Sequence, residues 1–292
     1  MKIALFYRVW FDTGEKFLES AKKEGIELIP IQYDDLTLRQ KGNEFKILYE
    51  GESLADFNLF YFRAVGGATE WANLLILYAQ RHKIPVVDDY LTDLGLEKRA
   101  KSIGGVILAG DKINYPKTSF ASNKERLLEE AKNFQYPFVL KISKGGRQGM
   151  GTLLIKDKEV LERAIKGRIE KTGFLLQEYV PNDGDYRLML IGYQVLGGFK
   201  RQKKEEKLVL NRSVGSSEVL KTIPQAIKEE AEKACRALKV EIASVDMVLD
   251  KRNNQPVVIE VNEAPQFEVF EKRTKIDVAK EIIRYLIKKA RK

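Results

Sequence analysis

A glycine-rich segment between two predicted strands constrains the fold of this chain more than any other feature. The apolar runs at residues 138–142 and 152–156 flank a loop that contains four glycines together with Lys144 and Arg147. Glycines let a backbone approach a phosphate group and direct its N–H groups toward it. Walker A loops and dinucleotide-binding fingerprints run from a strand into a helix, whereas this segment runs from strand to strand. The segment therefore excludes both motifs, and the remaining alternative, a flexible hairpin turn, does not explain the basic residues.

Predicted strands and helices alternate through the first third of the chain. This alternation predicts a small parallel sheet, in which ligands bind where the strands end. Arg8, Arg63 and the pair Gly66-Gly67 fall at those strand ends. The predicted strands are residues 2–9, 26–31, 59–62 and 85–87, and the predicted helices lie between residues 12 and 25 and over residues 70–81.

After about residue 95 the predicted secondary structure changes, because short strands dominate and helices separate them. We therefore predict an α/β chain with a small parallel-sheet N-terminal domain and two α+β sub-domains. The predicted boundaries are residues 1–95, 96–173 and 174–292. Within the last of these, the predicted strands are residues 174–179, 186–191, 194–200, 243–250 and 256–261.

Composition narrows the class of protein. The 292 residues contain no apolar run of about 18 residues, which excludes a spanning helix, and we expect a cytoplasmic protein without a membrane partner. A single cysteine, Cys235, excludes an internal disulfide, and the only histidine, His82, gives little support to a Cys–His nucleophile. The net charge of +9 favours an anionic partner such as a nucleotide, an acidic substrate or nucleic acid.

Two carboxylates and an amide form the strongest candidate for a metal site. Glu260 and Asn262 are two residues apart on a predicted strand, so their side chains point to the same face. Asp246 lies on the preceding strand, and a polar turn joins the two strands as a hairpin. Oxygen ligands that converge in this way suit Mg²⁺, which takes carboxylates plus substrate phosphates. The alternative is a solvated sheet face with scattered charges.

Two further groups of residues fit a nucleotide site less specifically. The strand end at residues 177–181 exposes backbone that can pair with an adenine edge, and Asp185 and Arg187 follow it. A simple strand, turn and strand would explain this group as well. Arg201 and Asn211 flank a charged run, from which both could reach a transferred phosphoryl group.

Taken in order, these motifs resemble those of ATP-grasp enzymes. More narrowly, the chain resembles the RimK/LysX-like branch of carboxylate–amine ligases, and the stretch from Ile259 to Glu268 is similar to its Glu-x-Asn-x-x-Pro-x-Phe-Glu signature. The resemblance covers about residues 95–290. It implies that the two α+β sub-domains grip ATP between them. One departure bears on substrate choice, because Ala264-Pro265-Gln266 stands where many members have Ser-Pro-Gly.

The resemblance implies three groups of site residues. Arg187, Arg201 and Asn211 would face the γ-phosphate and an acyl-phosphate, and Arg63 with Gly66-Gly67 would help to bind substrate. Asp246, Glu260 and Asn262 would hold one or two Mg²⁺ ions, with Mn²⁺ as an alternative. The nucleotide-binding residues would be Lys98, Lys101, Lys141, Gly145, Gly146, Gln148, Gly149, Gly151, Glu178, Tyr179, Val180 and Asp185.

The implied reaction has two steps and needs no covalent nucleophile from the protein. A substrate carboxylate takes the γ-phosphoryl group of ATP, and an amine then displaces phosphate to form an amide. The partners would be a small-molecule or peptide carboxylate and an amine or amino acid, and a homo-oligomer is compatible with the sequence. An ATP-grasp kinase acting on a hydroxyl group is the main alternative. A nucleic-acid binder is disfavoured, because no RNA-binding signature accompanies the charge.

Overall fold

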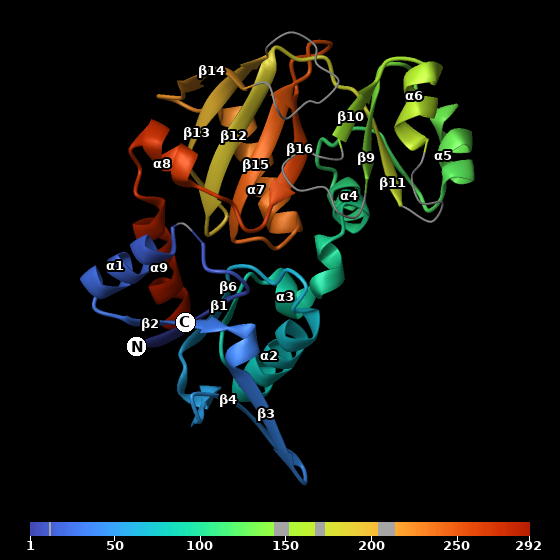
Figure 1. Ribbon diagram of the computed structural model, residues 1–292. Coiled ribbons are helices and arrows are strands. Elements are labelled where there is room, and N and C mark those ends of the chain that lie inside the picture. Colours follow the sequence, from blue (N-terminus) through green and yellow to red (C-terminus); the bar gives the residue numbers. More distant parts are fainter. Residues whose placement is uncertain (12, 143–151, 167–172, 204–213) are drawn as a thin grey trace.

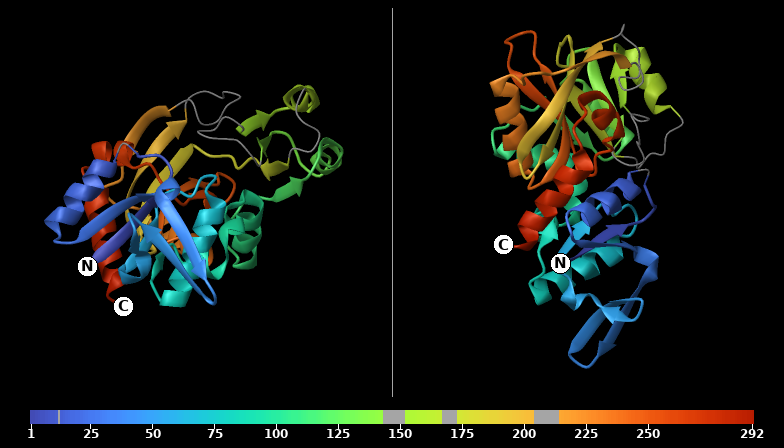
Figure 2. Two further views of the ribbon diagram at one scale, coloured as in Figure 1. Left: turned by 60° about the horizontal axis from the view of Figure 1, so that its bottom comes forward. Right: turned by 90° about the vertical axis from the view of Figure 1, so that its left-hand side faces the viewer.

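The computed structural model describes residues 1–11, 13–142, 152–166, 173–203 and 214–292 of the chain. These residues form four sheets, the smallest of them three-stranded, arranged as an N-terminal part and two further parts (Figure 1). Two other views show the same arrangement and place the two ends of the chain close together, beside the N-terminal sheet (Figure 2).

The N-terminal sheet is parallel, as the alternation of strands and helices predicted. Its strand order is β2-β1-β6-β7, and every pairing is parallel. Apolar runs such as Ile3 to Phe6 are buried on both faces, because helices cover the sheet on each side. The elements are β1 (Lys2–Tyr7), α1 (Gly14–Lys23), β2 (Glu27–Gln32), β6 (Leu59–Phe62), α2 (Thr69–His82), β7 (Val86–Val87) and α3 (Tyr90–Asp93).

A small three-stranded antiparallel sheet, which the sequence did not predict, projects from this domain as a long hairpin of β3 and β4 (Figure 1). It comprises β3 (Leu36–Lys41), β4 (Glu44–Tyr49) and β5 (Glu52–Ser53). Residues 37–41 are exposed, and their mixed polar sequence lacks the apolar alternation that identifies a half-buried strand. The hairpin is anchored at its base by Ile47 and Leu48, which are buried.

The middle of the chain forms a small antiparallel sheet covered by two helices. The strand order is β10-β9-β11-β8, and the covering helices are capped by Asn123 and Asp157, whose side chains accept backbone N–H bonds. Phe138, Leu140 and Phe174 fill the core between the sheet and the helices. The elements are α4 (Lys101–Gly110), β8 (Thr118–Ala121), α5 (Lys124–Ala131), β9 (Phe138–Ile142), β10 (Thr152–Ile155), α6 (Lys158–Ile165) and β11 (Phe174–Glu178).

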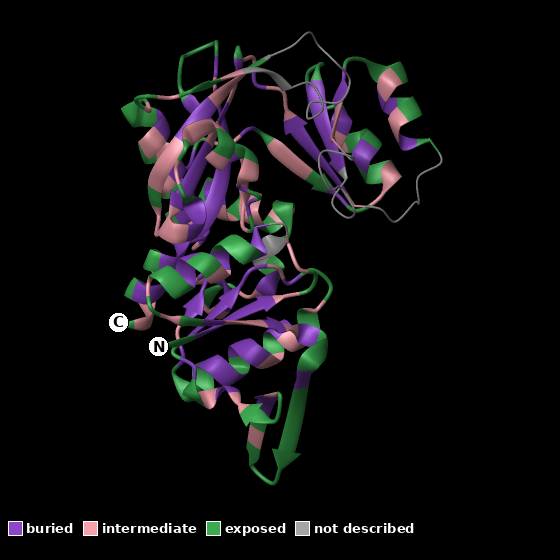
Figure 3. Cartoon of the chain, turned by 60° about the vertical axis from the view of Figure 1, so that its left-hand side comes forward, coloured by how far each residue is buried: buried purple, intermediate pink, exposed green. Residues whose placement is uncertain are grey.

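The last sheet has five antiparallel strands in the order β14-β13-β12-β15-β16. Its strands alternate between a face that packs against α7 and a face that carries polar side chains, and buried strand segments run through its centre (Figure 3). Leu188, Val245 and Val258 lie on the packed face. The elements are β12 (Gly184–Ile191), β13 (Gln194–Lys203), β14 (Val214–Val219), α7 (Gln225–Ala237), β15 (Ile242–Leu249) and β16 (Pro256–Asn262).

Two helices at the end of the chain join this sheet to the N-terminal domain. In α8 (Glu268–Thr274), Phe270 packs with Phe199 of β13, while α9 (Val278–Ala290) lies against α1 and β6. The predicted division of the chain after residues 95 and 173 stays a prediction. None of the helices in the described ranges is both long and apolar enough to cross a bilayer.

Candidate active site

Two neighbouring strands, β15 and β16, bring the predicted metal-binding residues together. In the pairing of β15 with β16, Asp246 lies opposite Glu260 and Ser244 lies opposite Asn262. A β-bulge follows, because Met247 pairs with Val258 and the intervening residue of β16 has no partner. The bulge lets Glu260 and Asn262 share the face of Asp246 while Val258 still packs in the core. The hairpin that the sequence predicted is therefore present.

Basic side chains surround these carboxylates. Arg187 of β12 lies opposite Asp246, with its Nε 3.6 Å from Asp246 Oδ1, and Arg201 Nη2 lies 3.1 Å from the same oxygen. Lys101, at the start of α4, places its Nζ 2.9 Å from Glu260 Oε1. These cations neutralise two carboxylates that point into a mostly buried space.

The two carboxylates differ in their acidity. Burial raises the pKa of Asp246 to about 6, against the opposing effect of the charges on Arg187 and Arg201. Burial also disfavours ionised Glu260, but the nearby Lys101 and Lys141 leave its pKa below the ordinary value. Glu260 is thus the more firmly ionised of the pair.

Lys141 of β9 is held by Gln177, which the sequence analysis placed only in the strand end proposed to pair with adenine. Its Nζ donates a hydrogen bond of 2.7 Å to Oε1 of Gln177, and only 7% of Lys141 and 2% of Gln177 are exposed. Burial lowers the pKa of Lys141 to about 8. Gln177 in turn donates to Thr118 Oγ1 over 3.2 Å. The strand alternation could have indicated this contact. Lys141 pairs with Leu175, and Gln177 lies two residues further along β11, on the same face as Leu175.

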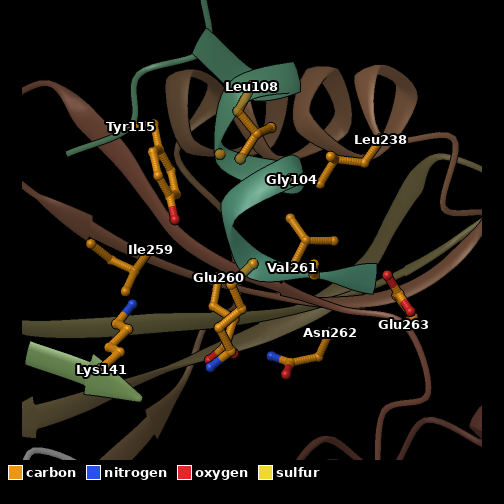
Figure 4. A pocket seen from close by; sticks show the side chains of 13 residues that line it. Gly104, Leu108, Tyr115, Lys141, Leu238, Ile259, Glu260, Val261, Asn262 and Glu263 are labelled. Atoms are coloured by element: carbon orange, nitrogen blue, oxygen red, sulfur yellow. The ribbon is translucent and has the colours of Figure 1, made fainter. Parts of the chain in front are cut away.

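A cavity of about 230 Å³ is lined by Lys101, Lys141 and Glu260. Helix α4 crosses it on one side, and Lys141, Glu260 and Asn262 lie on the other (Figure 4). Gly104 and Gly105 let the helix approach, since a Cβ atom added to Gly105 would lie 3.3 Å from the ring of Tyr115. The cavity thus contains two lysines and a carboxylate at one end of α4, a combination that suits a metal-bound polyphosphate.

The predicted adenine hinge joins two parts of the molecule. Val180 is buried with Val248 and Val257, and the carboxylate of Glu178 accepts a hydrogen bond of 2.5 Å from Arg252 Nη1. Tyr179 lies between them, and Arg252 belongs to the turn between β15 and β16. The hinge is therefore fixed against the hairpin that carries Asp246 and Glu260.

The predicted roles of Asp185 and Arg63 stay predictions, and both side chains have partners within the protein. Asp185, predicted to lie near a ribose, accepts at Oδ2 a 2.7 Å bond from Arg201 Nε and so holds Arg201 beside Asp246. Arg63 is 6% exposed and donates to the carbonyl oxygen of Pro265 over 2.8 Å, which makes it a bridge between domains. The predicted residues Gly145, Gly146, Gln148, Gly149, Gly151 and Asn211, and the side chain of Lys98, lie outside the described residues.

The residues present fit Mg²⁺ only together with a nucleotide. Within the described ranges, no three histidine, cysteine or acidic side chains group closely enough to hold a metal by themselves. Asp246 and Glu260 face each other and Asn262 adds an amide oxygen, so the protein offers part of an octahedral shell. Phosphate oxygens and water would complete it.

The arrangement of the sheets is that of solved ATP-grasp proteins. A RimK-domain ATP-grasp protein from Sphaerobacter thermophilus superposes with a TM-score of 0.73, at 19% identity, over 98% of this chain and 100% of that chain. The ATP-grasp ligase PsnB, solved with a minimal precursor, superposes with a TM-score of 0.74, at 15% identity, over 98% of each chain. The predicted fold class, an ATP-grasp core behind a parallel-sheet domain, is confirmed.

Sequence similarity narrows this class further. Residues 97–286 match the model of the RimK-like ATP-grasp domain, and the chain belongs to that family. A protein of Methanococcoides burtonii named "Probable alpha-L-glutamate ligase" is 28% identical over 295 residues, 99% of this chain and 96% of that protein. One of the same name from Vibrio atlanticus is 26% identical over 298 residues, 100% and 97% of the two chains. The predicted class of enzyme, an ATP-dependent ligase forming carbon–nitrogen bonds, is confirmed.

Proposed function

We propose that this ligase activates a substrate carboxylate as an acyl-phosphate and couples it to an amine, with L-glutamate as one of its two substrates. The names of the full-length relatives support glutamate. Peptide-bound neighbours of the same fold, such as PsnB with its precursor, support a peptide or small molecule as the other substrate.

The nucleotide would lie in the cavity between α4 and β16. Lys101 and Lys141 would bind its phosphates, and Glu178, Tyr179 and Val180 would line the adenine. Asp246, Glu260 and Asn262 would hold Mg²⁺, which neutralises charge on the phosphates during transfer. PsnB has been solved with Mg and ADP, which supports the same pair of ligands for this fold.

The reaction balances without a covalent step on the protein. A carboxylate oxygen attacks the γ-phosphorus atom, the bond to the β-phosphate oxygen breaks, and ADP leaves. The amine nitrogen then attacks the carbonyl carbon, phosphate departs, and the nitrogen loses a proton. Arg187 and Arg201, held by Asp246 and Asp185, would stabilise the negative charge on the transferred group.

One observation carries this proposal. Glu260 opens into the same cavity as a buried lysine, Lys141, and Asp246 lies opposite Glu260 in the pairing of β15 with β16. Burying that lysine and those carboxylates costs free energy that hydrophobic residues would not. A charged ligand that binds all of them would explain the arrangement.

Hydroxylamine trapping tests the proposal. Purified protein, Mg²⁺ and ATP are incubated with L-glutamate or with a panel of amino acids and acidic peptides, and hydroxamates are detected by mass spectrometry. We expect an ATP-dependent hydroxamate from the acid substrate and an amide when a matching amine replaces hydroxylamine. A phosphorylated product that hydroxylamine does not intercept would indicate a kinase and contradict the proposal.

A further inference from the structure

An unpaired arginine stands at the ligand-binding edge of the N-terminal sheet. Arg8 follows β1 and Arg63 follows β6, and these two strands are parallel neighbours. The backbone N–H of Arg63 donates to the carbonyl oxygen of Phe6 over 3.0 Å, so both arginines leave the sheet at the same edge. Ligands of parallel sheets bind at this edge.

That edge faces the segment that follows the proposed metal ligands. Arg63 contacts the carbonyl oxygen of Pro265, three residues after Asn262, and its guanidinium lies 5.1 Å from the ring of Phe11 and 5.9 Å from that of Phe267. Because Arg63 is buried in these contacts, it fixes the two domains relative to each other. Arg8 belongs to the same edge and is exposed.

Two glycines shape the position of Arg8. A Cβ atom on Gly66 would lie 3.1 Å from Arg8 Cδ, and one on Gly67 would lie 3.1 Å from Arg8 Nη1. The side chain therefore lies along bare backbone, where a larger residue would displace it. Such a constraint gives a long side chain a preferred direction without a polar partner.

The charge of Arg8 is free, whereas three cations of the proposed active site are engaged. Among the described residues, Arg8 forms neither a hydrogen bond nor an ion pair. By contrast, Lys101 contacts Glu260, Arg187 contacts Asp246, and Arg201 contacts Asp185. A guanidinium with no internal partner can bind a carboxylate with two parallel hydrogen bonds.

We propose that Arg8 binds a substrate carboxylate other than the one that is activated. This inference rests on the proposed ligase function and assigns the substrate an additional anionic group. The carboxylate has two chemical sources, namely a second carboxylate on the acid that is phosphorylated, or the carboxylate of an amino acid that supplies the amine. The role of Arg8 is the same in both.

Three variants and one control test Arg8. Arg8→Gln removes the charge, Arg8→Lys keeps the charge but loses the planar fork, and Gly67→Ala displaces the guanidinium while leaving it charged. Arg39→Gln, on the exposed strand β3, removes one positive charge far from the cavity (Figure 1). Arg8 is exposed, so we expect all four proteins to fold, which thermal denaturation checks.

Steady-state kinetics separate the two sources of the carboxylate. If the acid donor supplies it, Arg8→Gln raises KM for the acid in the hydroxylamine assay about tenfold. If the amino acid acceptor supplies it, hydroxamate formation stays at the wild-type level and KM for the acceptor rises instead. Arg8→Lys and Gly67→Ala should give smaller increases, and Arg39→Gln none. KM values within twofold of wild type in both assays for Arg8→Gln would overturn the proposal.

Equilibrium binding distinguishes a wrong assignment of Arg8 from a wrong function. Titration calorimetry of L-glutamate into the protein with ADP and Mg²⁺ needs no turnover. Affinity about tenfold weaker for Arg8→Gln than for wild type supports the role of Arg8 in binding. If no ligated product is found as well, the missing product contradicts only the ligase mechanism. Equal affinities, or no glutamate binding by the wild type, count against Arg8 itself.

Discussion

At the scale of single residues, the site depends on charges that the fold holds away from water. Burial raises the pKa of Asp246 while two arginines oppose that effect, whereas two lysines leave the pKa of Glu260 below its ordinary value. The charge states of the carboxylates and the cations therefore depend on one another. Removing one of these side chains changes ligand binding and folding stability by different amounts.

Glu260→Gln isolates the charge of one proposed metal ligand from its shape. We expect turnover to fall by at least about a thousandfold, because an amide cannot neutralise the metal as a carboxylate does. The melting temperature should change little, since glutamine keeps the shape of the side chain and the lost Lys101–Glu260 pair is partly exposed. Glu218→Gln, on the exposed edge strand of the same sheet, is the control. Near wild-type turnover in Glu260→Gln would count against the metal assignment.

The pKa of Lys141 predicts a pH dependence of nucleotide binding. Burial lowers this pKa to about 8, and bound phosphates would raise it again. Below about pH 8 the lysine is already charged and affinity for ADP should be level. Above it, binding must take up a proton, so affinity should fall by up to about tenfold per pH unit. Calorimetry between about pH 7 and pH 9.5 measures this decline.

An arginine at the same position gives the control for that decline. Lys141→Arg keeps its charge throughout this pH range, so its affinity for ADP should vary little, whatever its absolute value. If wild-type affinity stays constant to pH 9.5, Lys141 does not titrate near 8 or does not contact the phosphates.

At the scale of elements, close strand packing positions the two arginines. β12 begins at Gly184, whose φ of +135° places it in a region that other residues avoid. There it lies against the backbone of Arg201 on β13. This contact sets the register in which Asp185 pairs with Arg201 and Arg187 with Asp246.

Gly184→Ala should therefore disturb both stability and catalysis. An added methyl group would overlap the carbonyl oxygen of Arg201, so we expect the free energy of unfolding to fall by about 2 kcal/mol. Chemical denaturation measures this loss. Gly110→Ala, at the end of α4, meets nothing within 4 Å and should change stability by less than about 1 kcal/mol. Equal stabilities of the two variants would show that the strands separate freely.

At the scale of the whole molecule, a polar cluster joins the N-terminal domain to the last sheet. Lys289 of α9 donates 2.6 Å bonds to both oxygens of Glu241 and to Asp89. Tyr193 also donates to Asp89 over 2.6 Å, and the buried carboxylate of Asp88 accepts the backbone N–H of Glu241 over 2.8 Å. Burial raises the pKa of Glu241 despite the charge of Lys289. This cluster ties the end of the N-terminal sheet to the start of β15.

Lys289→Met should weaken that junction. It leaves Glu241, which is 2% exposed, without its cation, so we expect a loss of about 3 kcal/mol in the free energy of unfolding. Lys288→Met, one residue earlier and exposed, should change stability by less than about 0.5 kcal/mol. Urea denaturation compares the two, and equal midpoints would mean that the cluster adds nothing to stability.

Local patterns in the sequence determined the elements and the faces of the catalytic strands. The period of two along β12 and β15, and from Glu260 to Asn262 in β16, places Arg187, Asp246 and Glu260 opposite the apolar residues and is visible without any partner strand. The parallel N-terminal sheet followed in the same way from alternating strands and helices. The hairpin of β3 and β4 was missed because its exposed strands carry no such period.

Only the tertiary structure decided which polar groups are partners. Gln177 holds Lys141 from 36 residues away, Asp185 holds Arg201 rather than standing free, and Arg63 reaches Pro265 across 202 residues. Residue periodicity is set by neighbours in the chain, whereas a buried charge takes whichever partner the folded chain brings within hydrogen-bond distance. That choice depends on how distant strands and domains pack, which no local pattern encodes.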